Sequence, residues 1–238
     1  FPFEIRDFPY GVIKGRYQPV DTILNLEGSK WDGARDVLNQ FRLNGRYYCA
    51  IYEISFDSLL YYRKSVLEGA GLKDPRTLFE NDEWTWDTFL DMARQFQQSG
   101  DGKYVIEGYN PENEFVVSTG TPIIENDGTK LINNMNNANV ERVMDLLSTL
   151  QKENLRYPLH ELNGWSVNPK AWAQGDILFY GNGGTWEFEG DSGLNKFAQR
   201  FGWNDDEICV VPYPRDPQAD KYYHFMKQDA MMWLSLIH

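Results

Sequence analysis

The sequence has few cysteines and histidines, and it has no long apolar run. Its 238 residues include two cysteines, Cys49 and Cys209, and three histidines. Two cysteines are too few for a disulfide framework, and neither residue type has the spacing of metal ligands, so we expect no metal site. No stretch of about 18 apolar residues occurs, which excludes a membrane-spanning helix.

Basic residues are also scarce. Lys and Arg total 23 against 35 Asp and Glu, a net charge of −12. Nucleic-acid affinity rests on cationic contacts with phosphates, so a nucleic-acid partner is not expected. Asn182-Gly183-Gly184 lacks the Lys-Ser or Lys-Thr of a phosphate-binding loop, and we expect no cofactor. Phe1-Pro2-Phe3-Glu4 has neither the basic start nor the apolar core of a signal peptide.

Aromatic residues, in contrast, are abundant. The chain has 8 Trp, 14 Tyr and 14 Phe, many of them beside Asn, Asp, Glu or Gly. This pairing favours recognition of a ligand with apolar faces and polar edges. Sugars fit that description, and so do peptides and aromatic metabolites.

Strand signals alternate with helical periodicity, which predicts an α/β fold. We predict strands over residues 47–54, 59–62, 104–109, 177–180 and 208–211, and helices over residues 64–70, 86–98, 138–154 and 169–174. Residues 1–30 are predicted to form a surface segment with one short helix at most, and residues 110–115 a polar loop that leads to another helix start. Asn44-Gly45 and residues 126–129 are predicted turns.

One stretch suggests a binding platform. The predicted strand 177–180 ends in Gly181-Asn182-Gly183-Gly184, a turn that would present Trp186 followed by Glu187. A flat apolar ring beside carboxylates suits a ligand that carries hydroxyl groups. The alternative is that Trp186 anchors the core or lies at its rim.

Four blocks in order resemble the family 1 extracellular solute-binding proteins of bacterial ABC importers. The blocks are Asn44-Gly45-Arg46-Tyr47-Tyr48 with 60–64, Gly69-Ala70-Gly71-Leu72 with 85–89, 172–177 with Gly184-Thr185-Trp186, and Val211-Pro212-Tyr213-Pro214. Two positions depart from the family pattern. Arg63 replaces a common asparagine, and Thr88 replaces the glutamate of a Thr-Trp-Asp-Glu helix start, so we expect half of the capping box to be missing.

The resemblance implies a type II periplasmic-binding-protein-like fold, in which two lobes close on a ligand about a hinge. It assigns residues 1–52 to part of the N-terminal lobe and the first hinge strand, and residues 53–207 to the C-terminal lobe. Residues 208–238 would form the second hinge strand and the start of the return to the N-terminal lobe. Much of the first lobe would lie outside this sequence, and we therefore expect a fragment.

Site residues follow from the same resemblance. It implies ligand contacts by Trp186, Glu53, Glu112, Glu114 and Phe115, because an aromatic ring can stack on a sugar while carboxylates accept its hydroxyl hydrogens. To these we add two neighbours, Glu187 and Tyr213. Glu53 has the alternative role of a charge that braces the hinge, and Glu112 and Glu114 the alternative of a solvated loop.

The implied function is capture of a sugar or oligosaccharide in an interlobe cleft and delivery to the permease of an ABC importer. We expect a monomer without enzymatic activity, either periplasmic or a cell-surface lipoprotein whose only membrane contact is a lipid anchor outside this chain. The alternatives are a glycoside hydrolase and a surface lectin-like module. A hydrolase would need paired carboxylates such as Glu187 with Glu189 or Glu53. Glu187 and Glu189 on one strand would point the same way and cannot flank a bond.

The two hinge assignments would place Cys49 and Cys209 on neighbouring strands. We expect two reduced thiols in preference to a disulfide.

The platform hypothesis makes one prediction. Trp186→Ala in the complete protein should weaken binding of its sugar by about tenfold or more, because a stacked ring loses its face. Isothermal calorimetry would measure the dissociation constant. An unchanged value would remove Trp186 from the binding site.

Overall fold

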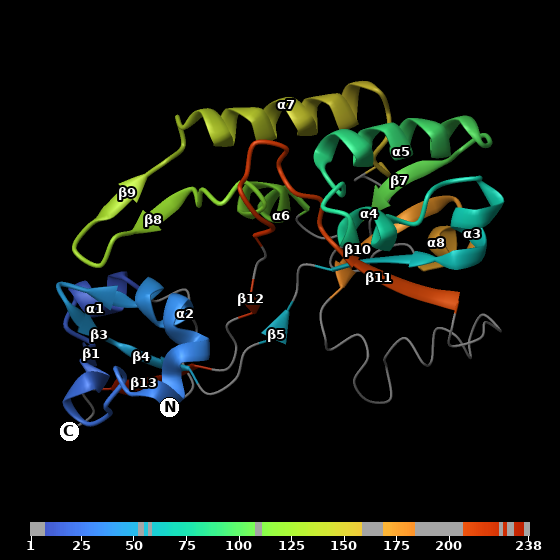
Figure 1. Ribbon diagram of the computed structural model, residues 1–238. Coiled ribbons are helices and arrows are strands. Elements are labelled where there is room, and N and C mark those ends of the chain that lie inside the picture. The colour runs from blue at the N-terminus through green and yellow to red at the C-terminus, as the bar shows by residue number, and fades with distance from the viewer. Residues whose placement is uncertain are drawn as a thin grey trace. The chain divides into compact units, whose positions relative to one another are not determined.

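The structure is a computed structural model, and it divides into two compact units (Figure 1). It describes residues 8–51, 55–56, 59–107, 111–158, 169–183, 207–223, 226–227 and 231–235. Unit 1 comprises Phe1–Ser55, Ile123–Met135 and Met226–His238, and unit 2 comprises Phe56–Pro122 and Asn136–Phe225. The predicted lobe boundaries at residues 52 and 207 stay a prediction.

Unit 2 is built on a four-stranded mixed sheet. Its strands are β6 (Leu59–Arg63), β7 (Tyr104–Glu107), β10 (Ile177–Gly183) and β11 (Ile208–Pro212), in the order β11-β6-β10-β7. β10 is parallel to β7 and antiparallel to β6, which is also antiparallel to β11. These strands confirm the predicted runs near residues 59, 104, 177 and 208.

Helices pack on this sheet. They are α3 (Lys64–Gly69), α4 (Pro75–Glu80), α5 (Trp86–Gln98), α6 (Pro111–Val117), α7 (Ala138–Lys152) and α8 (Pro169–Gln174). α5 contacts β7, α8 contacts β10, and α6 contacts α7. None of the helices among the described residues has both the length and the apolar character needed to span a membrane.

The start of α5 corrects one prediction from the sequence. Thr85 is the N-cap, as expected, but the capping box is complete. The Thr88 hydroxyl accepts a hydrogen bond from the Thr85 backbone N–H at 2.9 Å, and the Thr85 hydroxyl accepts one from the Thr88 N–H at 3.5 Å. A threonine hydroxyl can accept as a glutamate does, so the substitution keeps both halves of the motif.

The long helix α7 confirms the predicted helix after Asn137, whose side chain accepts from the Asn139 N–H. Val140, Val143, Leu146 and Leu150 form its buried face. Met144 is 50% exposed.

Unit 1 contains a three-stranded antiparallel sheet in the order β1-β13-β4. Its elements are α1 (Tyr10–Ile13), β1 (Tyr17–Gln18), 3-10 helices at Val20–Thr22 and Ser29–Ala34, α2 (Arg35–Gln40), β2 (Arg42–Leu43), β3 (Arg46–Tyr47), β4 (Cys49–Ile51), β8 (Ile124–Asn126), β9 (Leu131–Asn133) and β13 (Met231–Ser235). Two short strands, β5 (Ser55–Phe56) and β12 (Met226–Lys227), complete the described elements.

The prediction of a surface segment over residues 1–30 is wrong for its described part. Val12, Tyr17, Val20 and Leu26 are buried in one core with residues of α2 and β4. Their burial depends on partners distant in sequence, which local periodicity does not reveal. The two predicted turns are confirmed, since β2 pairs with β3 around Asn44-Gly45 and β8 pairs with β9 around residues 127–130.

The hypothesis of neighbouring cysteine strands is also wrong. Cys49 lies on β4, whose sheet neighbour is β13, and Cys209 lies on β11, which pairs with β6. The strand of Cys209 belongs to the sheet of unit 2 and does not pair with β4. No disulfide joins Cys49 and Cys209.

The completed capping box predicts a measurable stability difference. Thr88→Ala removes the hydroxyl that accepts from Thr85 N–H, so we expect the free energy of unfolding to fall by about 1 kcal/mol. Thr149→Ala is the matched control, because the Thr149 hydroxyl donates to the Asp145 carbonyl within α7 and caps nothing. Urea denaturation would compare them, and equal losses would contradict the capping role.

Candidate ligand-binding site

The carboxyl ends of β7 and β10 lie at one edge of the unit 2 sheet. The predicted site residues that the structure describes are near this edge. The two strands are parallel, and Tyr180 of β10 is in register with Glu107, the last residue of β7. In α/β sheets, ligands bind beyond the carboxyl ends of the strands. Glu107 places a buried carboxyl group at this edge, with 1% of its surface exposed.

The segment predicted as a polar loop is the helix α6. It begins at Pro111, a residue suited to the first helical position because it has no backbone N–H to satisfy. Glu112 and Glu114 lie in its first turn, where the helix dipole favours negative charge. Both are partly exposed, while Phe115 and Val116 supply the buried face.

Arg156 fixes one side of this helix start. Its guanidinium group donates a short hydrogen bond to the Glu112 carboxylate, and their side chains are 12% and 39% exposed. The backbone around Arg156 runs beside β7, since the Tyr157 N–H donates to the Ile106 carbonyl at 3.1 Å. The sheet edge therefore positions the cation, and the cation orients Glu112.

Phe115 and Tyr213 meet beneath α6. Their ring centroids are 5.5 Å apart at an interplanar angle of 83°, and Phe115 also contacts Phe89 and Trp86 of α5. Phe115 has no exposed surface and Tyr213 has 1%. Both rings are buried in the core behind the site, so they support it from inside the protein. Their direct contact with a ligand stays a prediction.

The hydroxyl group of Tyr213 has a backbone partner. It donates to the carbonyl oxygen of Gly181 at 2.8 Å. Burial raises the pKa of Tyr213 well above its ordinary value, and the nearby carboxylates of Glu114 and Glu112 raise it further, against the opposing charge of Arg156. The phenol is therefore neutral and remains a hydrogen-bond donor.

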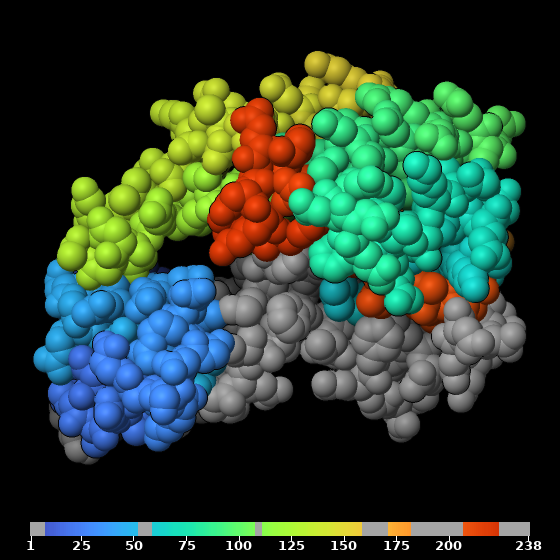
Figure 2. All heavy atoms as spheres, in the orientation of Figure 1, coloured from blue at the N-terminus to red at the C-terminus, as the bar shows by residue number. Residues whose placement is uncertain are grey.

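The segment after Pro212 is anchored at the start of α5. Residues 213–223, orange-red in Figure 2, lie against the green surface at the start of α5. The Arg215 backbone exchanges hydrogen bonds with Trp84 and Trp86, and the fully buried Asp216 is ion-paired with Arg142 of α7. These contacts hold Tyr213 in a defined position.

Strand β10 continues further than predicted. The expected turn at residues 181–184 is wrong for its first part, because the strand runs to Gly183 with a register shift after Tyr180. Trp186 and Glu187 follow in the sequence, but they lie outside the described residues, as does Glu53. Their predicted roles stay predictions.

The structure thus brings together four of the predicted residues, Glu112, Glu114, Phe115 and Tyr213. Sequence reasoning missed Glu107, Arg156 and Gly181. Glu107 is the polar end of an otherwise apolar strand, a signal that a site prediction can use. Arg156 had no signal, because a single cation after a helix has no distinguishing pattern.

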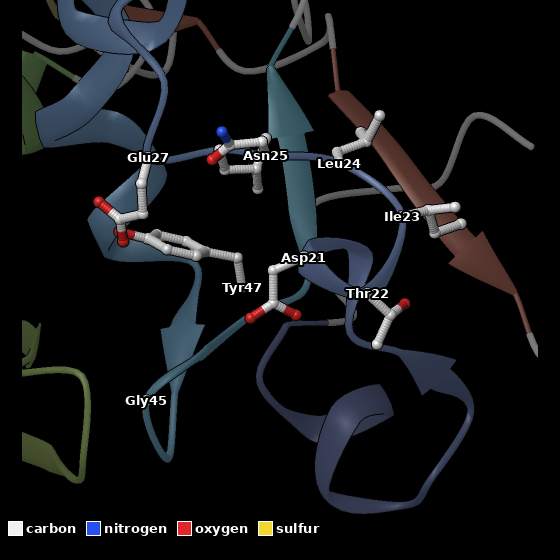
Figure 3. Close-up of a pocket in the computed structure, with 9 residues that line it drawn as sticks. Asp21, Thr22, Ile23, Leu24, Asn25, Glu27, Gly45 and Tyr47 are labelled. Atoms are coloured by element: carbon white, nitrogen blue, oxygen red, sulfur yellow. The ribbon is translucent and has the colours of Figure 1, made fainter.

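A pocket of about 450 Å³ lies in unit 1, lined by residues 21–27 with Gly45 and Tyr47 (Figure 3). Its two carboxylates already have partners. Arg46 donates two hydrogen bonds of 2.9 Å to Asp21, which lowers the pKa of that carboxyl group, and Arg35 pairs with Glu27 at 3.3 Å. None of the predicted site residues lines this pocket.

In the described part of the chain, no group of three or more His, Cys, Asp or Glu side chains could hold a metal ion. The three histidines, at positions 160, 224 and 238, lie outside that part.

A family comparison identifies the class of protein. The sequence profile of the bacterial extracellular solute-binding proteins matches residues 6–224. The match covers most of the chain, which therefore belongs to this family. A search of curated proteins found no match.

Solved structures share the fold. The binding protein associated with an ABC transporter of B. animalis subsp. lactis Bl-04, in complex with beta-1,6-galactobiose, is 17% identical with a TM-score of 0.63 over 95% of this chain and 52% of that chain. The sugar-binding protein MalE of Xanthomonas citri is 15% identical with a TM-score of 0.67 over 96% and 55%.

The galacto-N-biose-/lacto-N-biose I-binding protein of Bifidobacterium longum, in complex with lacto-N-biose, is 16% identical with a TM-score of 0.62 over 96% and 53%. The chain spans about half the length of each of these three structures. At these identities the likeness shows the fold, which is α/β and periplasmic-binding-protein-like as predicted.

The ion pair at α6 generates a prediction. Arg156→Met keeps an unbranched, flexible side chain but leaves Glu112 without this cation, so we expect the free energy of unfolding to fall by about 1 kcal/mol, and by less at high salt. Lys64→Met is the control, because the Lys64–Glu68 pair spans 3.9 Å between side chains that are 60% and 65% exposed. Urea denaturation at low and high salt would measure the free energy of unfolding of both variants. If the Arg156 pair contributed nothing, the two variants would lose the same free energy at both salt concentrations.

Proposed function

We propose that this chain is part of a solute-binding protein that captures a sugar or oligosaccharide and delivers it to an ABC importer. The observation that carries the proposal is membership of the bacterial extracellular solute-binding family through residues 6–224. Two solved proteins of similar fold, in complex with beta-1,6-galactobiose and lacto-N-biose, support a sugar as the ligand class.

The chemistry of the α6 start supports the same ligand class. The carboxylates of Glu112 and Glu114 are partly exposed and accept hydrogen bonds, which sugar hydroxyl groups donate. Charge-assisted hydrogen bonds of this kind are stronger than neutral ones. We propose that Glu53, Trp186 and Glu187 complete the site, with the indole ring of Trp186 stacked on the sugar.

Partner and location follow from the proposed transport role. The partner would be the permease of the importer, and the protein would act outside the cytoplasmic membrane. Any membrane attachment would use a lipid anchor outside this chain. Binding without turnover is the proposed activity, since family membership favours a binding protein over a glycoside hydrolase.

Calorimetry with beta-1,6-galactobiose, lacto-N-biose and maltose tests the proposal on the complete protein. We expect saturable binding of at least one sugar and no release of monosaccharide on prolonged incubation. Glu112→Gln and Glu114→Gln should each weaken binding by about tenfold, because each loses a charge-assisted hydrogen bond.

Glu141→Gln is the matched control, since Glu141 is exposed in the first turn of α7 and lies outside the proposed site. It should bind as the unaltered protein does. Hydrolysis of a disaccharide would instead favour the glycosidase, and failure to bind any of the three sugars would contradict the proposed ligand class.

A further inference from the structure

Tyr213 connects two strands that are not neighbours. It follows β11, and its hydroxyl reaches Gly181 on β10, although β6 lies between these strands in the sheet. Adjacent strands are about 4.8 Å apart, so the phenol crosses roughly two strand spacings beyond the strand end. The ring of Tyr213 packs against Phe115, which holds the phenol in this position.

Gly181 lies where β10 departs from regular pairing. Tyr180 pairs with Tyr61 and Gly183 pairs with Leu59, so three steps along β10 oppose two steps along β6. One extra residue is therefore inserted, which is the pattern of a β-bulge. A bulge leaves a residue outside the ladder and turns the strand, and the Tyr213 hydroxyl bonds to a carbonyl group at this point.

Only glycine fits at this contact. A Cβ atom on Gly181 would lie 2.5 Å from the Tyr213 hydroxyl oxygen and 3.1 Å from the Glu107 carbonyl oxygen. Real Cβ atoms essentially never approach another atom as closely as 2.5 Å, and a contact of 3.1 Å with a backbone oxygen is tighter than most. The absence of a side chain therefore lets Tyr213 come within hydrogen-bonding distance of the strand.

We propose that Tyr213 is a positioning residue, whose hydroxyl holds the bulge at Gly181 and so fixes the course of β10, the strand that precedes Trp186 in the sequence. The proposal rests on the proposed function for its ligand, but the contact itself is independent of any ligand. It replaces the prediction that Tyr213 touches the sugar. The buried hydroxyl already has a partner, and the ring has almost no free surface.

Tyr213→Phe tests this role, because it keeps the ring and its contact with Phe115 while it removes one hydroxyl. We expect amide hydrogen exchange at Asn182 and Gly183 to accelerate. Affinity for whichever of maltose, beta-1,6-galactobiose and lacto-N-biose binds should fall by about three- to tenfold, the effect of one lost hydrogen bond.

Tyr62→Phe is the matched control. Tyr62 is also fully buried in this sheet, and its hydroxyl donates to Asp74, the N-cap of α4, at 2.5 Å. It makes the same chemical change away from the end of β10. We expect Tyr62→Phe to reduce overall stability while sugar affinity and local exchange at Asn182 stay unchanged.

Two results would overturn the proposal. The first is a rate of amide exchange at Asn182 and Gly183 that does not change in Tyr213→Phe, or that rises no more than in Tyr62→Phe when the two variants are compared at equal stability. The other is local acceleration without loss of affinity in a protein that binds one of the sugars. If the unaltered protein binds none of them, the proposed function fails, and the exchange measurement alone decides whether Tyr213 holds the strand.

Discussion

Packing of aromatic rings between helices and sheet is the interaction on which unit 2 depends. Phe89 of α5 contacts Phe179 of β10 and Phe115 of α6, with centroids 6.1 and 5.8 Å apart, and Phe115 contacts Tyr213. Buried rings of this size contribute much of the apolar area of a core. One cluster therefore joins the central helix, the strand that leads to Trp186 and the helix with the candidate carboxylates.

Elements whose pattern is local were predictable from the sequence. α5 and α7 have periodic apolar faces and side-chain caps at Thr85 and Asn137, and both begin where predicted. The segment around Val12 and Val20 could not be predicted, because its residues are buried in one core with residues of α2 and β4, which are distant in sequence. α6 was missed since its acidic first turn resembles a solvated loop, and its buried residues are only Pro111, Phe115 and Val116.

Candidate site residues could be selected from the sequence, but their arrangement could not. Resemblance to the family selected Glu112, Glu114 and Phe115, and the structure places them on one short helix beside Tyr213. Sequence does not distinguish a ring offered to a ligand from one that supports the site, because that depends on burial. Nor does it indicate that Gly181 lies in a bulge, since the register of β10 is set by pairing with β6.

The hydroxyl-only capping box of α5 has a consequence for the conditions in which the helix persists. A glutamate at position 88 would titrate near its ordinary pKa of about 4.3. Threonine has no charge to lose, so the hydrogen bonds between Thr85 and Thr88 are the same in acidic and in neutral surroundings. The helix that supports Phe89 thus starts from a contact that is insensitive to acid and to salt.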